Sequence, residues 1–478
     1  MPILTVRQGI RRLDIPFSPG DCLGDLLHGL DHAHPCGGRG TCGKCRVMIA
    51  GQAHSVLSCQ TRLDNQDTQV FLPESLPISQ IALTGTQMEK AGADSRVGAA
   101  VDIGTTTVAL ALYDLGSGAC LAETGMLNPQ TSIAADVIGR IDAAINGQLD
   151  TQQKLILAAI DTLLERACAQ AHIEKDRVTD RVITGNTTML YLLTGNNPVS
   201  LSHAPFEADT LFGVQNPQGY LPPCMNAFVG ADITCAALAS GMCQSSETAL
   251  LCDLGTNGEL ALWKDGRLYV TSTAAGPVFE GASISCGVAS VPGAIDRVWV
   301  QDGALCVHTI ADAPAIGVCG SGLLDACAAM LELEIMDETG YLEDETCQIA
   351  PGVSLTQADI RAVQLAKAAI YAGIRTLLHT ACCSPEEIAR FHVAGGFGSH
   401  ARMTSAAAIG MLPENLAARA GTLGNAALRG AAMLLLQSEA RREAEAIAAS
   451  AVHVPLGGNP VFNETYIDAM MFEQEEER

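Results

Sequence analysis

Two stretches of the chain share one order of apolar and polar positions. In residues 99–114 and again in residues 250–262, an apolar run ends at an Asp-x-Gly-Thr tip, and alternating apolar positions follow a short polar corner. An apolar run followed by alternation predicts a buried strand, a tight turn and a second strand. The repeat therefore predicts two similar hairpins, in two similar lobes that face one another.

Each predicted tip carries one carboxylate, Asp102 in the first hairpin and Asp253 in the second, beside a glycine and several hydroxyl or amide groups. Backbone N–H and hydroxyl donors suit phosphate oxygens, and a carboxylate suits the water shell of Mg²⁺. An Asp-x-Gly turn alone also occurs in hairpins that bind nothing, so the repeat is what favours a nucleotide. Asp102 and Asp253 are the candidate catalytic residues. The candidate phosphate-binding residues are Gly104, Thr105, Thr106, Gly255, Thr256 and Asn257.

A glycine-rich turn follows later in the chain. Residues 316–326 predict a turn in which Ser321 caps an Ala- and Leu-rich helix, so that the N–H groups near Gly320 could meet an anion. Gly320 and Ser321 are therefore candidate cofactor-binding residues. Cys319, in the same turn, is interpreted as a packing residue rather than a redox thiol.

A second glycine-rich turn is predicted where the strand at residues 391–394 ends. Gly395 and Gly396 have no side chain to exclude a flat ring, so the backbone there can pack against a nucleoside. Gly398 is assigned to the same nucleoside-binding turn.

The helical period predicts two long amphipathic helices, from about Thr151 to Ala171 and from Thr356 to about Leu378. Arg361 and Lys367 are placed on the polar face of the second. Residues 182–189 and 228–233 each predict a strand, a glycine turn and the start of a helix. Residues 424–432 predict a helix of small residues.

The first 80 residues predict a separate unit. Residues 3–6 and 11–15 predict a hairpin, and Asp21 begins a short predicted helix, with Cys22 in the core. Four cysteines follow with the spacing C-x5-C-x2-C-x13-C, and three thiolates in a glycine-rich loop with a fourth from a later segment are typical of a [2Fe–2S] cluster. A zinc site is the alternative, but zinc sites usually have two Cys-x-x-Cys pairs and this set has one. The candidate metal ligands are Cys36, Cys42, Cys45 and Cys59.

Composition narrows the choice of partners. The net charge is −24 without a basic stripe, which argues against nucleic acid, because its phosphates are neutralised by Lys and Arg. No apolar run approaches the roughly 20 residues that span a bilayer, and the N-terminus lacks the apolar core of a secretory signal. Most of the 18 cysteines stand alone in apolar segments, as small buried hydrophobes do. We expect a cytoplasmic protein with no nucleic-acid or membrane partner.

These patterns predict three parts. Residues 1–80 form a [2Fe–2S] ferredoxin-type domain, residues 81–97 form a linker, and residues 98–478 form a domain of two lobes, the second opening near residue 248.

The predicted turns resemble the motifs of a known superfamily of ATPases. The turns resemble five blocks of the superfamily that includes actin, sugar and acetate kinases and heat-shock chaperones. Asp102 and Asp253 lie in the two phosphate blocks, Gly185 and Gly424 in the two connecting blocks, and Gly395 in the adenosine block. The chain is more similar still to one family in it, the reductive activators of corrinoid proteins. The segments that carry this resemblance are residues 185–189, 253–259, 274–277, 279–281, 319–322, 364–370 and 395–398.

The resemblance implies an α+β, ferredoxin-like β-grasp domain at the N-terminus and an α/β, two-lobed, actin-like ATPase domain with ribonuclease-H-like lobes. It implies ATP and Mg²⁺ as cofactors beside the [2Fe–2S] cluster. It also implies a cellular reductase as electron donor and a corrinoid protein as acceptor, whose Co(II) is reduced to Co(I) with the help of ATP. The better-known members carry a further domain between the cluster and the ATPase, where this chain has only the short linker. The acceptor and a homodimeric state therefore stay open.

Three other functions fit the same residues. The chain could be an ATP-dependent electron donor to a non-corrinoid enzyme, or a small-molecule kinase regulated by a redox-sensing ferredoxin domain. It could also be an electron carrier that is gated by ATP binding without turnover. A phosphorylated product would identify the kinase, and ATP binding without turnover would identify the electron carrier.

Overall fold

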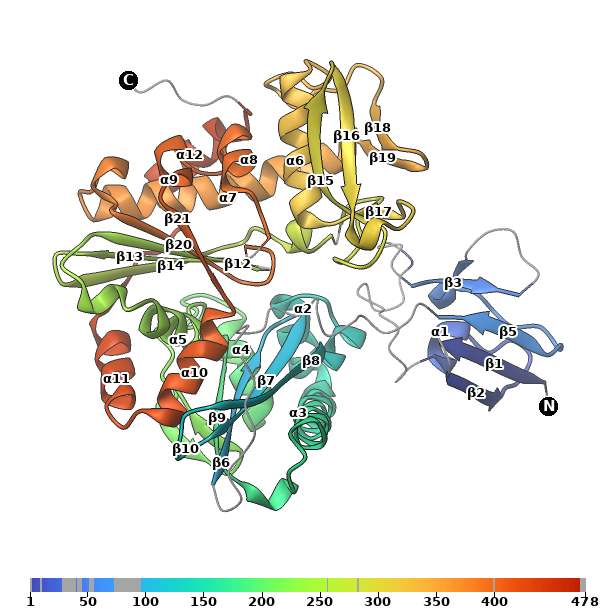
Figure 1. Ribbon diagram of the computed structural model, residues 1–478, viewed down its shortest axis with the longest axis horizontal. Helices are drawn as coiled ribbons and strands as arrows, with labels where there is room; N and C mark the ends of the chain where they lie inside the picture. The colour runs from blue at the N-terminus through green and yellow to red at the C-terminus, as the bar shows by residue number, and fades with distance from the viewer. Residues whose placement is uncertain are drawn as a thin grey trace.

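The computed structural model describes residues 2–8, 11–27, 40, 45–50, 56–72, 96–255, 257–281, 283–398 and 400–472. Figure 1 shows a small N-terminal unit at one side and two larger lobes, one above the other. Each of the three parts is built on its own sheet. We call the lobe with strands β6–β11 lobe I and the lobe with strands β12–β14, β20 and β21 lobe II.

The N-terminal unit contains a five-stranded mixed sheet in the order β2-β1-β5-β3-β4. The predicted hairpin is confirmed, because β1 pairs antiparallel with β2, and β1 also pairs in parallel with β5. The short helix α1 does not begin at Asp21 as predicted; its N-cap is Cys22, and the Asp21 carboxylate accepts from the Ser18 N–H instead. The elements are β1 (Ile3–Gln8), β2 (Arg11–Pro16), α1 (Leu23–Leu26), β3 (Arg46–Ile49), β4 (Val56–Leu57) and β5 (Thr68–Phe71).

Lobe I is built on a six-stranded sheet in the order β10-β11-β9-β6-β7-β8. The predicted first hairpin is confirmed as β6 and β7, and six of the seven β6 residues are buried, with Asp102 as the exception. Strand β9 runs parallel to β6 on its other side. The strands are β6 (Val97–Ile103), β7 (Thr107–Asp114), β8 (Cys120–Leu127), β9 (Val178–Gly185), β10 (Val214–Asn216) and β11 (Gly219–Leu221).

Lobe II repeats this arrangement in the order β21-β20-β12-β13-β14-β22. The second predicted hairpin is β12 and β13, and β20 runs parallel to β12 just as β9 runs parallel to β6. Small two- and three-stranded sheets extend this lobe. The strands are β12 (Ala249–Leu254), β13 (Gly258–Lys264), β14 (Arg267–Thr273), β15 (Ala294–Gln301), β16 (Ala304–Thr309), β17 (Gly317–Val318), β18 (Thr346–Ala350), β19 (Val353–Thr356), β20 (Arg390–Ala394), β21 (Ala420–Gly424) and β22 (Ala451–His453).

Helices cover the faces of both sheets (Figure 1). The two long helices are confirmed as α3 and α7. Residues 228–233 were predicted as a strand, a glycine turn and the start of a helix. The helix start is confirmed, with Gly230 as the N-cap. The strand is wrong, because the Asn226 side chain accepts from the N–H groups of Phe228 and Val229 and holds a bend. The helices are α2 (Val137–Ala143), α3 (Leu149–Ala171), α4 (Thr187–Thr194), α5 (Ala231–Ser240), α6 (Gly320–Glu332), α7 (Gln357–Thr380), α8 (Met403–Ala408), α9 (Glu414–Ala417), α10 (Ala426–Leu436), α11 (Ala440–Ser450) and α12 (Pro460–Asp468).

Helix α10 lies between β21 and β22 of lobe II in the chain but packs against α5 and the sheet of lobe I. The contact is close at Gly430, where an added Cβ would lie 2.1 Å from the carbonyl oxygen of Cys235. The apolar residues of α5, α10 and α11 form one buried cluster together with residues of β12–β14. The two lobes therefore share part of their core.

Lys367 on α7 differs from its predicted position on a polar face, because it is fully buried. Its ammonium donates to the carbonyl oxygens of Ala469, at 2.7 Å, and Met471, and it lies 4.9 Å from the centre of the Phe472 ring. These contacts fasten the segment after α12 onto α7.

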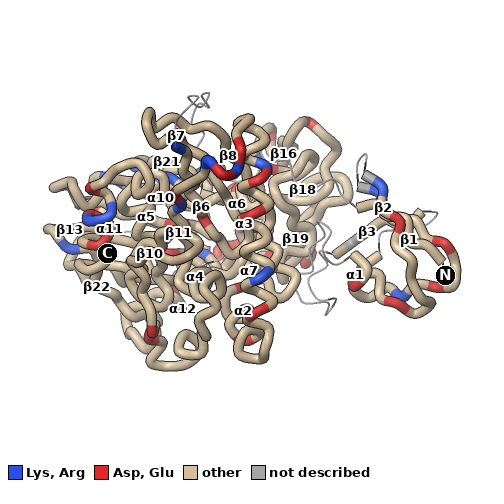
Figure 2. The backbone as a smooth tube through the Cα atoms, turned by 90° about the horizontal axis from the view of Figure 1, so that it is seen from below, with Lys and Arg blue, Asp and Glu red and all other residues tan. Residues whose placement is uncertain are grey.

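Figure 2 shows Lys and Arg positions scattered over the lobes rather than gathered in a stripe. Within the described ranges, the helices include none with the length and apolar character that crossing a bilayer needs.

Candidate functional site

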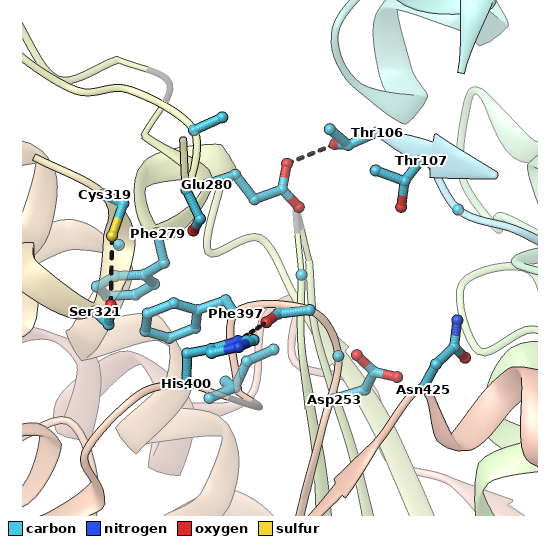
Figure 3. Close-up of a pocket in the computed structure, with 18 of the residues that line it drawn as sticks. Thr106, Thr107, Asp253, Phe279, Glu280, Cys319, Ser321, Phe397, His400 and Asn425 are labelled. Atoms are coloured by element: carbon cyan, nitrogen blue, oxygen red, sulfur yellow. Dashed lines mark hydrogen bonds between the residues drawn. The ribbon is translucent and has the colours of Figure 1, made fainter. Parts of the chain in front are cut away.

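A cleft of about 790 Å³ lies between the two lobes. Its walls come from the tips of the hairpins β6–β7 and β12–β13, the turn after β20, the start of α6 and the N-terminus of α10 (Figure 3). The cleft collects most of the residues predicted from the sequence. They are Asp102, Gly104, Thr105, Thr106, Asp253, Gly255, Asn257, Gly320, Ser321, Gly395 and Gly396.

Two predicted residues are not among the lining residues. Thr256 lies outside the described residues. Gly398 lies one layer behind the cleft, where an added Cβ would come within 2.4 Å of the Ala394 carbonyl oxygen, so it allows the turn to fold tightly onto β20.

The tip of the first hairpin is held by its own backbone and by one amide side chain. The Gly104 N–H donates to the Thr107 carbonyl at 2.9 Å. Asn186, the N-cap of α4, accepts from the Met189 N–H and donates to the Thr105 hydroxyl at 3.2 Å. The hydroxyl and N–H groups of the tip are thus oriented before any ligand binds.

A hydrogen bond between Thr106 and Glu280 joins the two lobes across the cleft. The Thr106 hydroxyl, on lobe I, donates to a carboxylate oxygen of Glu280, on lobe II, at 2.5 Å (Figure 3). Glu280 ends a short 3-10 turn at Pro277–Glu280. This contact links the position of the phosphate-side tip to the position of lobe II.

Carboxylates crowd the centre of the cleft. Burial raises the pKa of Asp102 to about 6, although Asn425, the N-cap of α10, donates to Asp102 at 2.9 Å and lowers it. Burial, with smaller contributions from Asp102 and Glu280, raises the pKa of Asp253 to about 7. Burial, with Asp253 and Asp102, raises the pKa of Asp232 to about 8. The raised pKa values of several carboxyl groups show that negative charge is unfavourable in the cleft. A bound cation would compensate that charge.

These carboxylates do not converge on one point. Among the described residues, no three His, Cys, Asp or Glu side chains are close enough to ligate one metal ion directly. Mg²⁺ in nucleotide sites commonly keeps several of its own waters, a mode of binding that does not need three direct protein ligands.

Two aromatic rings line another part of the cleft. The rings of Phe279 and Phe397 are stacked, with centroids 5.0 Å apart and planes inclined by 14°, and both face the cleft (Figure 3). Gly395 has a φ of +88°, and an added Cβ there would lie 2.6 Å from an Asp253 carboxylate oxygen. The turn after β20 therefore brings an apolar surface and a carboxylate next to one another.

The helix α6 begins beside this aromatic pair. Its N-cap is Cys319 and not Ser321, and no side chain caps it, so the predicted capping role of Ser321 is wrong. Ser321 instead lies 3.4 Å from the Cys319 sulfur, and Cys319 is buried as predicted. An added Cβ at Gly320 would lie 1.9 Å from the Phe279 carbonyl oxygen, so glycine is needed there for close packing.

Sequence reasoning missed several cleft residues. Phe279, Glu280 and Phe397 lie in segments that carry the family resemblance, but no role was assigned to them, and Asp232 was not singled out; the fold brings all four to the cleft. Asp232 follows a glycine corner at the start of a helix, and this position after the predicted turn at Gly230 is the signal that could have found it.

The N-terminal unit brings two predicted cluster ligands together. The sulfur atoms of Cys45 and Cys59 are 3.1 Å apart, and neither is in a disulfide. Burial raises the pKa of the Cys59 thiol, as does the adjacent Cys45. Cys36 and Cys42 lie outside the described residues. Cys22 is buried beside the pair and donates to the carbonyl oxygens of Ser58 and Cys59, as expected of a core residue.

The lobes and the cleft define a class of protein. Two lobes of the same strand order, each with its hairpin tip at a shared acidic cleft, form an actin-like fold of the class named ASKHA after acetate and sugar kinases, heat-shock chaperones and actin. The family model described as "C-terminal domain of RACo the ASKHA domain" matches residues 247–478. The model described as "RACo middle region" matches residues 97–245, which contain the sheet of lobe I.

Characterised relatives narrow the class to a family. The corrinoid activation enzyme RamQ of Eubacterium limosum is 34% identical over 418 residues, which cover 78% of this chain and 70% of that protein. A [Co(II) methylated amine-specific corrinoid protein] reductase of Methanosarcina barkeri is 25% identical over 415 residues, covering 77% and 76%. The chain belongs to the family of reductive activators of corrinoid proteins.

A solved structure shares the fold. It is that of a reductive activator for a corrinoid, iron-sulfur protein, and it superimposes with a TM-score of 0.72 over 98% of both chains at 24% sequence identity.

Proposed function

We propose that this protein uses ATP to drive the reduction of Co(II) to Co(I) in a partner corrinoid protein, by one electron from a [2Fe–2S] cluster. The observation that carries the proposal is the pair of free thiols at Cys45 and Cys59, in the same chain as the ASKHA cleft. RamQ is named for corrinoid activation and the Methanosarcina reductase for a Co(II) corrinoid protein, and both names support the choice of acceptor.

The N-terminal unit is proposed to be a ferredoxin-like β-grasp domain. Its mixed five-stranded sheet and short helix α1 agree with this proposal, and Cys36 and Cys42 would complete the ligand set. When bound, the cluster would accept and pass on one electron. Around it, Cys45 is buried while Cys59 keeps part of its surface open. The Gln60 amide donates to the Cys59 sulfur at 3.6 Å, and such N–H···S contacts tune a cluster's potential.

ATP is proposed to bind in the interlobe cleft. Thr105, Thr106 and Asn257 would meet the phosphates, as would Thr256. The Asp102 and Asp253 carboxylates would face hydrated Mg²⁺ and the attacking water. Their raised pKa values support this assignment, because a divalent cation replaces protons that crowding otherwise keeps on the carboxyl groups. On the other side, Gly395 and Gly396 would lie against the nucleoside, beside the Phe279 and Phe397 pair.

Coupling between ATP and the partner would run through the lobes. The Thr106–Glu280 hydrogen bond makes the position of lobe II sensitive to whatever displaces the phosphate-side tip. A one-electron transfer that is uphill by about 59 mV costs about 1.4 kcal/mol. A change in partner affinity of a few kcal/mol between nucleotide states is therefore enough to make a difficult reduction feasible.

Electrons are proposed to come from a cellular reductase, in the cytoplasm. The described cysteines are free thiols, as a reducing compartment keeps them. The Methanosarcina reductase is named for a corrinoid protein as its substrate, so the proposed partner is a protein that carries a corrinoid.

The test is an anaerobic reduction assay. The protein is reduced by one electron, mixed with a Co(II) corrinoid protein from the same genome, and Co(I) absorbance is followed with and without ATP. We expect Co(I) to form only with ATP and to be lost in Cys45→Ala and Asp253→Asn. Cys22→Ala is the matched control, because this thiol lies next to the cluster ligands but is not one of them.

Absence of Co(I), with an intact cluster and ATP hydrolysis, would exclude this acceptor and point to a non-corrinoid enzyme. Transfer of phosphate to a sugar or acyl compound would instead favour the redox-regulated kinase.

A further inference from the structure

Arg140 is a charged side chain buried in lobe I. It lies on α2, its relative exposure is 0%, and it is the largest of the fully buried side chains. Its guanidinium donates to the Thr105 carbonyl at 2.5 Å and to the Ala134 carbonyl at 3.1 Å. It also contacts the Gln130 side-chain oxygen at 3.3 Å and the Met189 sulfur at 3.2 Å. Arg140 thus stands directly behind the tip that carries Thr105 and Thr106.

Every one of these acceptors is neutral. Among the described residues, no carboxylate comes within ion-pair distance of Arg140. Burial lowers the pKa of Arg140 to about 10, while the nearest carboxylates, Asp136 and Glu280, raise it, so the side chain stays charged at neutral pH. Burying an unpaired charge is costly unless another charge compensates it. The compensating charge is expected in the cleft.

The lobe I side of the cleft has no cation of its own at the surface. The described lobe I residues that line it include two carboxylates and no lysine or arginine, and they are Asp102, Gly104, Thr105, Thr106, Thr107, Asn186 and Asp232. The lining arginines, Arg297 and Arg402, come from lobe II, and Arg402 is already paired with Asp325. Arg140 is thus the cation closest behind the predicted phosphate-binding tip.

We propose that Arg140 is a positioning residue whose buried charge, acting through the Thr105 tip, makes the cleft select the terminal phosphates of ATP. Its hydrogen bond to the Thr105 carbonyl orients the tip, and its positive charge offsets the carboxylates around the phosphates. This inference deepens the proposed function, because it rests on ATP binding in the cleft.

The experiment measures the affinities of the full-length protein for ATP and for adenosine, at one fixed Mg²⁺ concentration. Three variants separate charge from geometry. Arg140→Gln removes the charge, and Arg140→Lys keeps it. Gln130→Glu is nearly isosteric and puts a carboxylate on the guanidinium, so that the charge is neutralised while the contact with Thr105 stays. It also removes the hydrogen bond from the Gln130 amide to the Gln152 carbonyl, and the affinity for adenosine shows whether that loss disturbs the site. Arg166→Gln removes an exposed arginine on α3 and is the control.

The preference for ATP over adenosine should fall by about tenfold or more in Arg140→Gln and in Gln130→Glu, the size of one charge interaction across a few ångströms of protein. It should change by less than about threefold in Arg166→Gln. Arg140→Lys should keep more of the preference than Arg140→Gln, because lysine still brings a positive charge, although it makes fewer of the hydrogen bonds of the guanidinium. If Arg140→Gln does not fold, Gln130→Glu decides the question. Adenosine affinity should stay the same in each folded variant.

An unchanged preference for ATP in Gln130→Glu would overturn the proposal. An equal loss of ATP and adenosine binding in Arg140→Gln would also overturn it, because such a loss would show that Arg140 has a purely structural role. The wild-type protein distinguishes the two failures. If it does not bind ATP better than adenosine, nucleotide binding itself fails, and with it the proposed function. If it does and the variants match it, only the role of Arg140 fails.

Discussion

Replacing Asp102 by asparagine should stabilise the protein without ligand, although it removes a candidate catalytic residue. Asp102 is ionised only against the cost of burial, and its pKa of about 6 compares with 3.8 for the free side chain. The folded state therefore holds a proton that the unfolded chain releases, and stability falls as the pH rises from 3.8 to about 6. Above that range the penalty is constant, at about 3 kcal/mol, because each pKa unit corresponds to about 1.4 kcal/mol.

Asparagine at this position keeps the shape and can still accept the hydrogen bond from Asn425, which is 2.9 Å long. We expect Asp102→Asn to raise the free energy of unfolding by up to about 3 kcal/mol at pH 8 and by almost nothing near pH 4. The assay is urea unfolding followed by circular dichroism at both pH values, without nucleotide or Mg²⁺. The same variant should lose the ATP-dependent step, so that stability and activity move in opposite directions.

Asp180 provides a control, because folding lowers its pKa instead of raising it. It lies on β9, and hydrogen bonds from Thr179 and then Arg96 lower its pKa, so the ionised form is favoured by folding. Asp180→Asn should destabilise the protein at pH 8, and this loss should disappear as the pH falls through the lowered pKa. The reasoning about Asp102 is refuted if Asp102→Asn is no more stable than the wild type at pH 8, or if its gain does not shrink toward pH 4.

Three further changes test the contacts around the cleft and the C-terminus. Thr106→Val removes the hydroxyl that reaches Glu280 and should speed nucleotide release about fivefold in stopped-flow measurements, whereas Thr107→Val, its neighbour, should not. Gly430→Ala should destabilise the protein by about 1–3 kcal/mol in thermal unfolding, because the new methyl group meets the Cys235 carbonyl. Gly421→Ala is the control and should be nearly neutral, because its methyl group would lie 4.0 Å from the nearest atom, the Phe391 carbonyl oxygen. Lys367→Met leaves two carbonyl groups without their donor and should cost about 2 kcal/mol, seen as earlier proteolytic release of the segment after α12. Equal proteolysis of this variant and the wild type would contradict the anchoring role.

Local patterns predicted the elements that are stabilised locally. The two hairpins were visible because an apolar run and an alternating run flank each polar tip, and both strands of each pair remain within a few residues of the turn. Helix α7 was visible because its apolar period and its capping residue, Thr356, agree.

The errors arose where a distant partner decides the outcome. Lys367 follows the helical pattern of a surface residue, but the carbonyl groups of the segment after α12 provide its hydrogen bonds in the interior. Residues 228–229 are apolar enough for a strand, yet the Asn226 side chain holds a bend there. Arg140 and Glu280 could not be assigned from spacing, since the groups that they contact lie on other elements.

The packing of α10 against lobe I affects how the protein folds during its synthesis. Helix α10 covers α5 and the sheet of lobe I, but it is encoded more than 180 residues after α5 ends, at Ala426–Leu436. While the ribosome is still adding lobe II, the face of α5 around Cys235 has no cover. A fragment that ends at residue 245 should therefore aggregate or recruit chaperones, and supplying residues 246–478 as a second fragment should rescue it. The two halves are better regarded as one folding unit that closes last at its C-terminal end.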